Sequence, residues 1–193
     1  MSLRGSALFR MITLALLVVA MTFWVFSVSL SARAQPSVLE TLLARQIRRL
    51  AVPRSLRHQQ NPVPSTPDLL VEARRHFADH CATCHGNDGS GNTEIGQHLY
   101  PRAPDMRLAA TQSLHDGELY YIIHNGIRFT GMPAWGPDTS HDHDSWELVH
   151  FIRHLPRLTS QEIEDMRQFN PKSPAEIEEE KEEEEFLNGK PSK

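Results

Sequence analysis

The stretch His80-Cys81-Ala82-Thr83-Cys84-His85-Gly86 decides the fold. Two thiols two residues apart, followed at once by an imidazole, form the C-x-x-C-H pattern of covalent haem c attachment. On one helical turn both thiols reach the vinyl groups at one edge of a haem, and His85 then lies under the iron as the proximal ligand. A structural zinc site needs four protein ligands, a thioredoxin-like pair needs a βαβ pattern, and a disulfide closing so small a loop constrains little. The motif therefore predicts one covalent haem c, bound through Cys81 and Cys84.

The residues around the motif predict helices throughout. Thr66 is a good N-cap before Pro67, and the apolar stripe that follows includes both cysteines, so that the thiols lie on the buried face of a first helix. We expect a second helix from about Ser113 to Asn125, stopped by Gly126. A third is expected to start at Asp144, with Glu147 completing a capping box, and to end at Pro156.

This part of the chain resembles the bacterial class I cytochromes c. The resemblance rests on the run from His80 to Gly91 and on Gly131-Met132-Pro133-Ala134-Trp135, which is similar to the axial-methionine loop of that family. It covers about residues 65–158 and is closest to the monohaem domains found in or beside respiratory oxidases. It implies an all-α, haem-wrapping domain, with the first helix packed on the third, that transfers single electrons outside the cytoplasmic membrane.

Met132 is the expected sixth iron ligand. A thioether favours Fe(II) and raises the reduction potential, as electron transfer requires, and Gly131 and Pro133 fit a tight, stiff loop across the haem face. Met106 is the main alternative. A bis-histidine site is a further alternative, with the second imidazole from His98, His115 or His124.

Several other residues are weaker candidates. The resemblance implies that a proline carbonyl holds the proximal His85, with Pro101 and Pro104 as candidates. Haem propionates could be held by Tyr100, Arg102, Arg128 or Trp135. The histidine- and aspartate-rich run 141–144 is interpreted as a solvated loop rather than a metal site, and His150 and His154 as surface groups.

Residues 1–34 are predicted to be a membrane anchor or an export signal. The apolar run at 11–30 has the length of a membrane-spanning helix, whereas Ala32-Arg33-Ala34 before Gln35 has the form of a cleavage site. Arginines after this segment outnumber those before it, which opposes the positive-inside tendency. We nevertheless expect the haem domain on the periplasmic side of the cytoplasmic membrane, or soluble in the periplasm or secreted if the chain is cut after Ala34.

Residues 35–64 are predicted to be a basic amphipathic helix followed by a proline-rich linker. Ser37 and Glu40 fit a capping box, and apolar residues recur at helical spacing up to Leu50. Two interpretations stay open: the helix lies on anionic lipid headgroups, or its apolar face packs on the haem domain.

Charge divides the 193 residues into three regions. Residues 1–64 hold eight arginines and one acid, residues 65–170 eight arginines and fifteen acids, and residues 171–193 four lysines and eight glutamates. The overall charge of −4 argues against nucleic-acid binding. Residues 159–193 are predicted to be an acidic tail, with a short helix capped by Thr159 and Glu162 and then a solvated helix or disordered stretch at 176–187.

These features predict a single-electron carrier rather than an enzyme. The expected partners are redox proteins with a basic docking surface and the membrane, with no nucleic acid and no small-molecule substrate. Two alternatives remain: a haem-containing subunit of a membrane oxidoreductase complex, and a gas-sensing or peroxidase-like haem protein with a labile sixth ligand.

Overall fold

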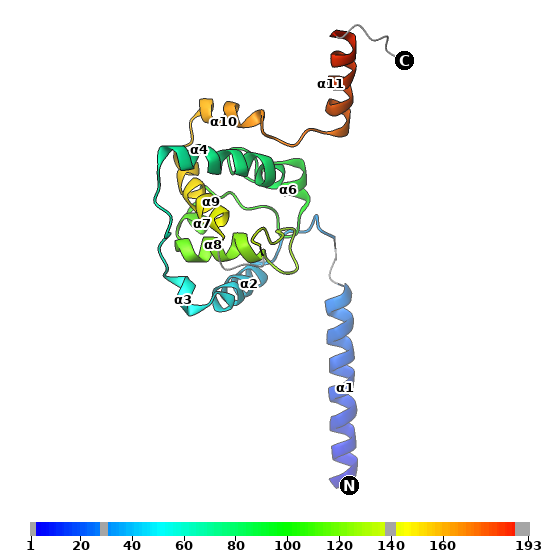
Figure 1. The fold of residues 1–193 in the computed structure, drawn as a ribbon. Coiled ribbons are helices and arrows are strands. Elements are labelled where there is room, and N and C mark those ends of the chain that lie inside the picture. Colours follow the sequence, from blue (N-terminus) through cyan, green and yellow to red (C-terminus); the bar gives the residue numbers. More distant parts are fainter. Residues whose placement is uncertain (1–2, 28–30, 138–141, 188–193) are drawn as a thin grey trace. The chain divides into compact units, whose positions relative to one another are not determined.

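The computed structural model describes residues 3–27, 31–137 and 142–187 (Figure 1). Every regular element in those ranges is a helix, as the sequence predicts. The chain divides into two units, residues 1–35 and 36–193, each described here by itself.

The first unit is built on one long helix, α1 (Leu3–Ser27). Its segment Ser6–Trp24, 19 residues, is long and apolar enough to cross a membrane by length and composition. The predicted span at 11–30 overlaps this helix, and its last three residues lie outside the described ranges.

The predicted first helix of the haem domain is present but is not uniform. Helix α4 (Pro67–His76) begins where the sequence places it, because the Thr66 side chain accepts a hydrogen bond from the Leu69 amide at 3.2 Å. One π-helical turn, η1 (Phe77–Cys81), then leads into α5 (Ala82–His85). Single π-helical turns within α-helices are frequently found at functional sites, and this one ends at Cys81, the first cysteine of the motif.

Two aromatic contacts mark the core between α4, α8 (Asp116–Asn125) and α9 (His143–His154). The rings of Phe77 and Phe151, both fully buried, lie 4.9 Å apart, so the first predicted helix packs on the third as the resemblance implies. Tyr120 stacks on Trp146 with ring centres 4.2 Å apart. The Phe77 and Phe151 rings are tilted by 53°, one of the arrangements that aromatic pairs prefer.

The starts of the second and third helices differ from the prediction. Helix α8 starts at Asp116, with His115 as N-cap. Helix α9 is capped by Asp142, whose Oδ1 accepts from the Ser145 amide at 3.0 Å, so the prediction of Asp144 as cap was wrong. Asp142 is selected by a tertiary contact, because its Oδ2 also lies 2.7 Å from Nδ1 of His124.

The remaining helices are short or lie outside the core. Helices α6 (Glu94–His98) and α7 (Ala109–Gln112) join α5 to α8, and η2 (Leu155–Arg157) follows α9. Helix α10 (Ser160–Arg167) has the predicted capping box of Thr159 and Glu162. Helix α11 (Pro174–Leu187) has no buried residue, which fits a solvated helix.

The basic segment before the haem domain forms α2 (Val38–Ala51) and α3 (Arg54–Arg57). The predicted linker that follows makes defined contacts with α8 and α9. The Gly117 amide donates to the Gln59 carbonyl at 3.1 Å, Asn61 Nδ2 donates to the Trp146 carbonyl at 2.7 Å, and Val63 is buried. Residues 36–66 therefore pack on the haem domain.

Candidate functional site

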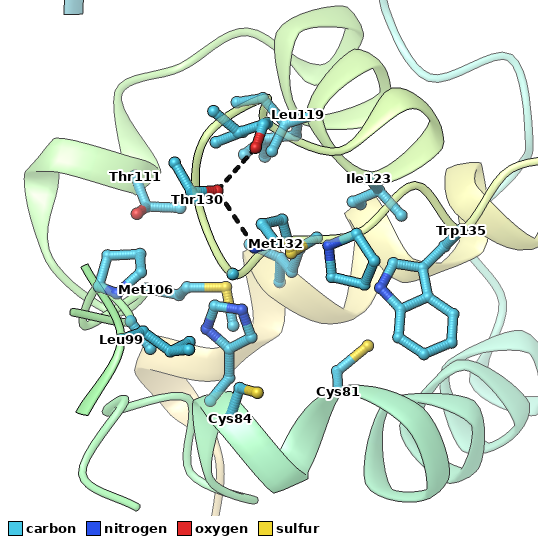
Figure 2. Close-up of a pocket in the computed structure, with 18 of the residues that line it drawn as sticks. Cys81, Cys84, Leu99, Met106, Thr111, Leu119, Ile123, Thr130, Met132 and Trp135 are labelled. Carbon is cyan, nitrogen blue, oxygen red and sulfur yellow. Dashed lines mark hydrogen bonds between the residues drawn. The ribbon is translucent and has the colours of Figure 1, made fainter. Parts of the chain in front are cut away.

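A mostly apolar cavity occupies the centre of the haem domain (Figure 2). A mostly apolar lining with a few polar side chains is typical of ligand and cofactor sites. One wall carries the C-x-x-C-H motif, and the loop after α8 forms the wall opposite (Figure 2). The aliphatic lining comes from Leu99, Leu114, Leu119, Ile122, Ile123, Ile127, Leu148 and Ile152.

Both cysteines line this cavity as free thiols. Burial raises the pKa of Cys81 to about 12 and also raises the pKa of Cys84. Zinc ligation and thiol–disulfide exchange need the thiolate, which a lowered pKa favours. Among the described residues, no group of three or more His, Cys, Asp or Glu side chains is placed to hold a metal ion. The surroundings of the thiols thus argue against the zinc and redox-pair alternatives.

His85 has the environment of a neutral ligand. Burial lowers its pKa, and the nearby carbonyl of Pro104 opposes that effect in part. Its Nδ1 is buried and, within the part of the chain that is described, makes no hydrogen bond of normal geometry. Of the two candidate prolines, Pro104 has its carbonyl next to the His85 ring. Pro101 also lines the cavity. An apolar cavity with two thiols and a neutral imidazole on one wall fits a covalently bound haem.

Met132 lies across the cavity from the cysteines (Figure 2). Its loop folds back on the end of α8: Ile127 donates its amide to the Met132 carbonyl at 3.0 Å, and the Met132 amide donates to Oγ1 of Thr130 at 3.1 Å. Gly126 starts this loop with φ 65° and ψ −168°, a conformation essentially restricted to glycine. Local hydrogen bonds therefore hold the thioether in the wall that faces the motif.

Met106 also lines the cavity and is buried, so the structure brings both candidate thioethers to the same space. The two methionines differ in their position relative to His85. Met106 follows two residues after Pro104, whose carbonyl faces His85. Met132 lies in the wall across the cavity from the motif, as Figure 2 shows.

The three histidine alternatives are engaged elsewhere and do not line the cavity. His98 contacts the Glu94 carbonyl of its own helix at 2.7 Å, His115 caps α8, and His124 pairs with Asp142. The histidine-rich run at 141–144 is only partly described, because His141 lies outside the described residues.

Of the residues suggested for haem propionates, Arg102 and Trp135 line the cavity. Tyr100 does not, and its hydroxyl donates to Glu40 of α2 at 2.5 Å. Arg128 is exposed and does not line it either. His150 and His154, expected at the surface, are half-buried and contact the Val63 carbonyl and Glu162.

Arg48 was missed by the sequence analysis. It lies in α2, outside the stretch that carries the resemblance, yet its side chain lines the cavity. Burial lowers its pKa, and the carboxylate of Glu118 opposes this. The only signal in the sequence was its place on the side of α2 opposite the apolar stripe.

Comparison with known proteins agrees with this site. Residues 69–152 match the family model described as cytochrome c oxidase, cbb3-type, subunit III. Two similar curated proteins are cbb3-type cytochrome c oxidase subunits FixP. The one from Sinorhizobium medicae is 39% identical over 75 residues, which is 38% of this chain and 24% of the relative. The one from Rhizobium meliloti is 38% identical over 80 residues, which is 41% of this chain and 25% of the relative.

The chain thus spans about a quarter of the length of the curated relatives that it matches. The residues matched by the family model include Cys81, Cys84, His85 and the Met132 loop, whereas Arg48 of α2 lies outside them. Residues 69–152 are thus similar to the cytochrome c domain of cbb3-type oxidase subunits, and the all-helical architecture agrees with that similarity.

Proposed function

We propose that this chain is a haem c subunit of a membrane oxidase complex and that it relays single electrons. The observation that carries the proposal is the apolar cavity with Cys81, Cys84 and His85 on one wall and Met132 on the other. When bound there, haem c supplies an iron that changes reversibly between two oxidation states.

The residues of the site divide the work of holding that group. Cys81 and Cys84 would bond it covalently, and His85 and Met132 would ligate the iron and leave no position for a substrate. The apolar lining excludes water, and Arg48 and Arg102 at the cavity wall are suited to the propionates. The chain makes and breaks no substrate bond in this role, so it serves the oxidase without being the catalytic subunit.

One haem is proposed for this chain, because it contains two cysteines and one C-x-x-C-H motif. We place the haem domain on the periplasmic side of the cytoplasmic membrane, anchored by the apolar run at 11–30, since covalent haem attachment is a periplasmic process in the family that the domain resembles. A redox partner with a basic docking surface would complement its acidic residues.

The mass of protein matured in a host that attaches haem c tests this proposal. We expect the mass of one haem beyond that of the polypeptide, retained after denaturation, and its loss or weakening in Cys84→Ala. The same measurement shows whether the chain is cut after Ala34. Colourless protein with no added mass would refute the proposal.

The state of the sixth ligand separates an electron carrier from a gas-sensing or peroxidase-like protein. We expect the reduced protein not to bind carbon monoxide at neutral pH, because Met132 would ligate the iron in the bound haem. Rapid carbon monoxide binding by the native protein would favour the sensor instead. Co-purification with oxidase subunits tests the assignment to a complex.

A further inference from the structure

Helix α2 is packed with its polar side on the protein and its apolar side outward. Six aliphatic side chains form a stripe along it, each between 53% and 79% exposed: Val38, Leu39, Leu42, Leu43, Ile47 and Leu50. The contacts with the haem domain come from the other side, where Thr41 and Arg48 are half-buried and Glu40 accepts the Tyr100 hydroxyl. Of the two interpretations left open by the sequence, packing of the apolar stripe on the domain is therefore wrong.

A contiguous apolar stripe of this kind marks an interaction surface, because soluble proteins rarely expose one. We propose that α2 lies in the headgroup region of an anionic membrane, with this stripe, called here the α2 stripe, turned toward the lipid. The proposal rests on the proposed function only in taking α1 as a membrane anchor.

The charges around the stripe favour anionic lipid. Arg45 and Arg49 border it and are exposed, and Arg54 follows in α3. Glu40, the only acid among residues 1–64, is already occupied by the Tyr100 hydroxyl and the Ser37 amide. A helix with an apolar face and arginines beside it is the pattern of interfacial helices on anionic bilayers. A basic redox protein, the partner expected for the acidic haem domain, would be repelled by the same arginines.

Chain length keeps α2 close to the bilayer. Ten residues separate Ser27, the end of α1, from Val38, the start of α2. A fully extended chain of that length reaches about 35 Å. If α1 crosses a membrane, α2 begins within that reach of the surface, which raises its local concentration there.

Lipid contact of α2 would also affect how the haem cavity is oriented. Arg48 lines the haem cavity on one side of the helix, and the α2 stripe is exposed on the other. A helix held at the lipid surface would fix the orientation of the cavity toward the membrane, instead of leaving the haem domain free on its tether.

The test measures how exposed α2 is to water in the full-length holoprotein. In holoprotein both native thiols are bonded to haem, so Leu43→Cys can be labelled alone with a spin label. Val71→Cys, at a half-exposed aliphatic position on α4, is the matched control. The protein is placed in lipid nanodiscs containing about 30% phosphatidylglycerol, an anionic lipid.

We expect a water-soluble relaxant to reach the label at residue 43 about fivefold or more weakly than the label at residue 71, with oxygen showing the opposite order. This difference should shrink in nanodiscs of phosphatidylcholine alone and in the Arg45→Gln, Arg49→Gln double variant. Equal exposure of the two labels in anionic nanodiscs would overturn the proposal. Protection of residue 43 only after oxidase subunits are added would also overturn it and identify a protein as the occupant.

The mass of the same samples separates the two proposals. A sample with haem attached and α1 retained but with residue 43 exposed refutes the lipid contact of α2 alone. A sample without haem refutes the proposed function.

Discussion

Gly126→Ala should both destabilise the domain and displace Met132. Gly126 has φ 65° and ψ −168°, which only glycine adopts readily. A Cβ at this residue would lie 2.5 Å from the Pro133 carbonyl carbon, 2.6 Å from the Ala134 amide nitrogen and 2.7 Å from the Met132 carbonyl oxygen. All three atoms are backbone, so the loop itself must move.

The magnitude follows from three contributions. The disfavoured conformation costs about 1–3 kcal/mol and the overpacking about 1–3 kcal/mol. Alanine returns about 0.4–1 kcal/mol by restricting the unfolded chain. The net loss in the free energy of unfolding should be about 3 kcal/mol, within the range of about 1–6 kcal/mol that these contributions span, and this is a large part of the roughly 5–15 kcal/mol of a typical domain.

Guanidinium denaturation of the holoprotein measures this loss, and the far-red absorption band of thioether-ligated ferric haem reports the Met132 bond. Gly131→Ala is the control. Its φ is not left-handed, and its Cβ would meet the end of the Leu99 side chain at 2.5 Å, which can rotate away. If Gly126→Ala costs less than about 1 kcal/mol, or no more than the control, the strain argument fails.

Three further outcomes are expected. Met132→Ala should abolish the far-red band and let carbon monoxide bind the reduced protein, while Met106→Ala should keep the band and lose about 2–5 kcal/mol of stability as a core truncation; the reverse pattern would move the ligand role to Met106. Hydrogen bonds from the Ser145 amide and His124 hold the pKa of Asp142 below its usual range despite burial, so this carboxylate stabilises the fold above about pH 4 and the benefit is lost as pH falls through the lowered pKa. Asp142→Ala should thus cost about 1–2 kcal/mol at pH 7 by thermal unfolding. This cost should shrink steadily as the pH is lowered through the acid range, and a cost that stays constant down to the acid unfolding of the protein would contradict this. Arg48→Gln should lower the reduction potential of the haem by about 40–90 mV, because loss of one partly buried positive charge makes reduction less favourable by roughly 1–2 kcal/mol. An unchanged potential in a redox titration would show that Arg48 does not contact the propionates.

The fold was predictable where helix ends are fixed by nearby residues. Thr66 with Pro67, and Thr159 with Glu162, begin helices as expected because their caps need only the next three residues. The prediction of Asp144 as a cap failed because two aspartates compete there, and the contact of Asp142 with His124, 18 residues away, decides between them. The π-helical turn before Cys81 has no local sequence signal of that kind.

The site shows the same division between local and distant information. Cys81, Cys84 and His85 lie within five residues, so the motif can be identified from its spacing in the sequence alone. Met132 was reached through its flanking residues and the family resemblance, whereas its separation from Met106 needed the observation that Pro104 faces His85. Arg48 could not be assigned, since only packing of α2 on the haem domain brings it to the cavity 33 residues before Cys81 along the chain.

The proposed position of α2 at the membrane surface explains why positive charge is concentrated in residues 1–64. The arginines after α1 oppose the positive-inside tendency if they face the periplasmic solution. In an interfacial helix they would instead pair with lipid phosphates, which lowers the cost of that orientation. The acidic residues at 65–170 then remain for a basic redox partner. Both attractions weaken in salt, but the lipid contact should persist longer because the α2 stripe adds an apolar contribution that ions do not screen.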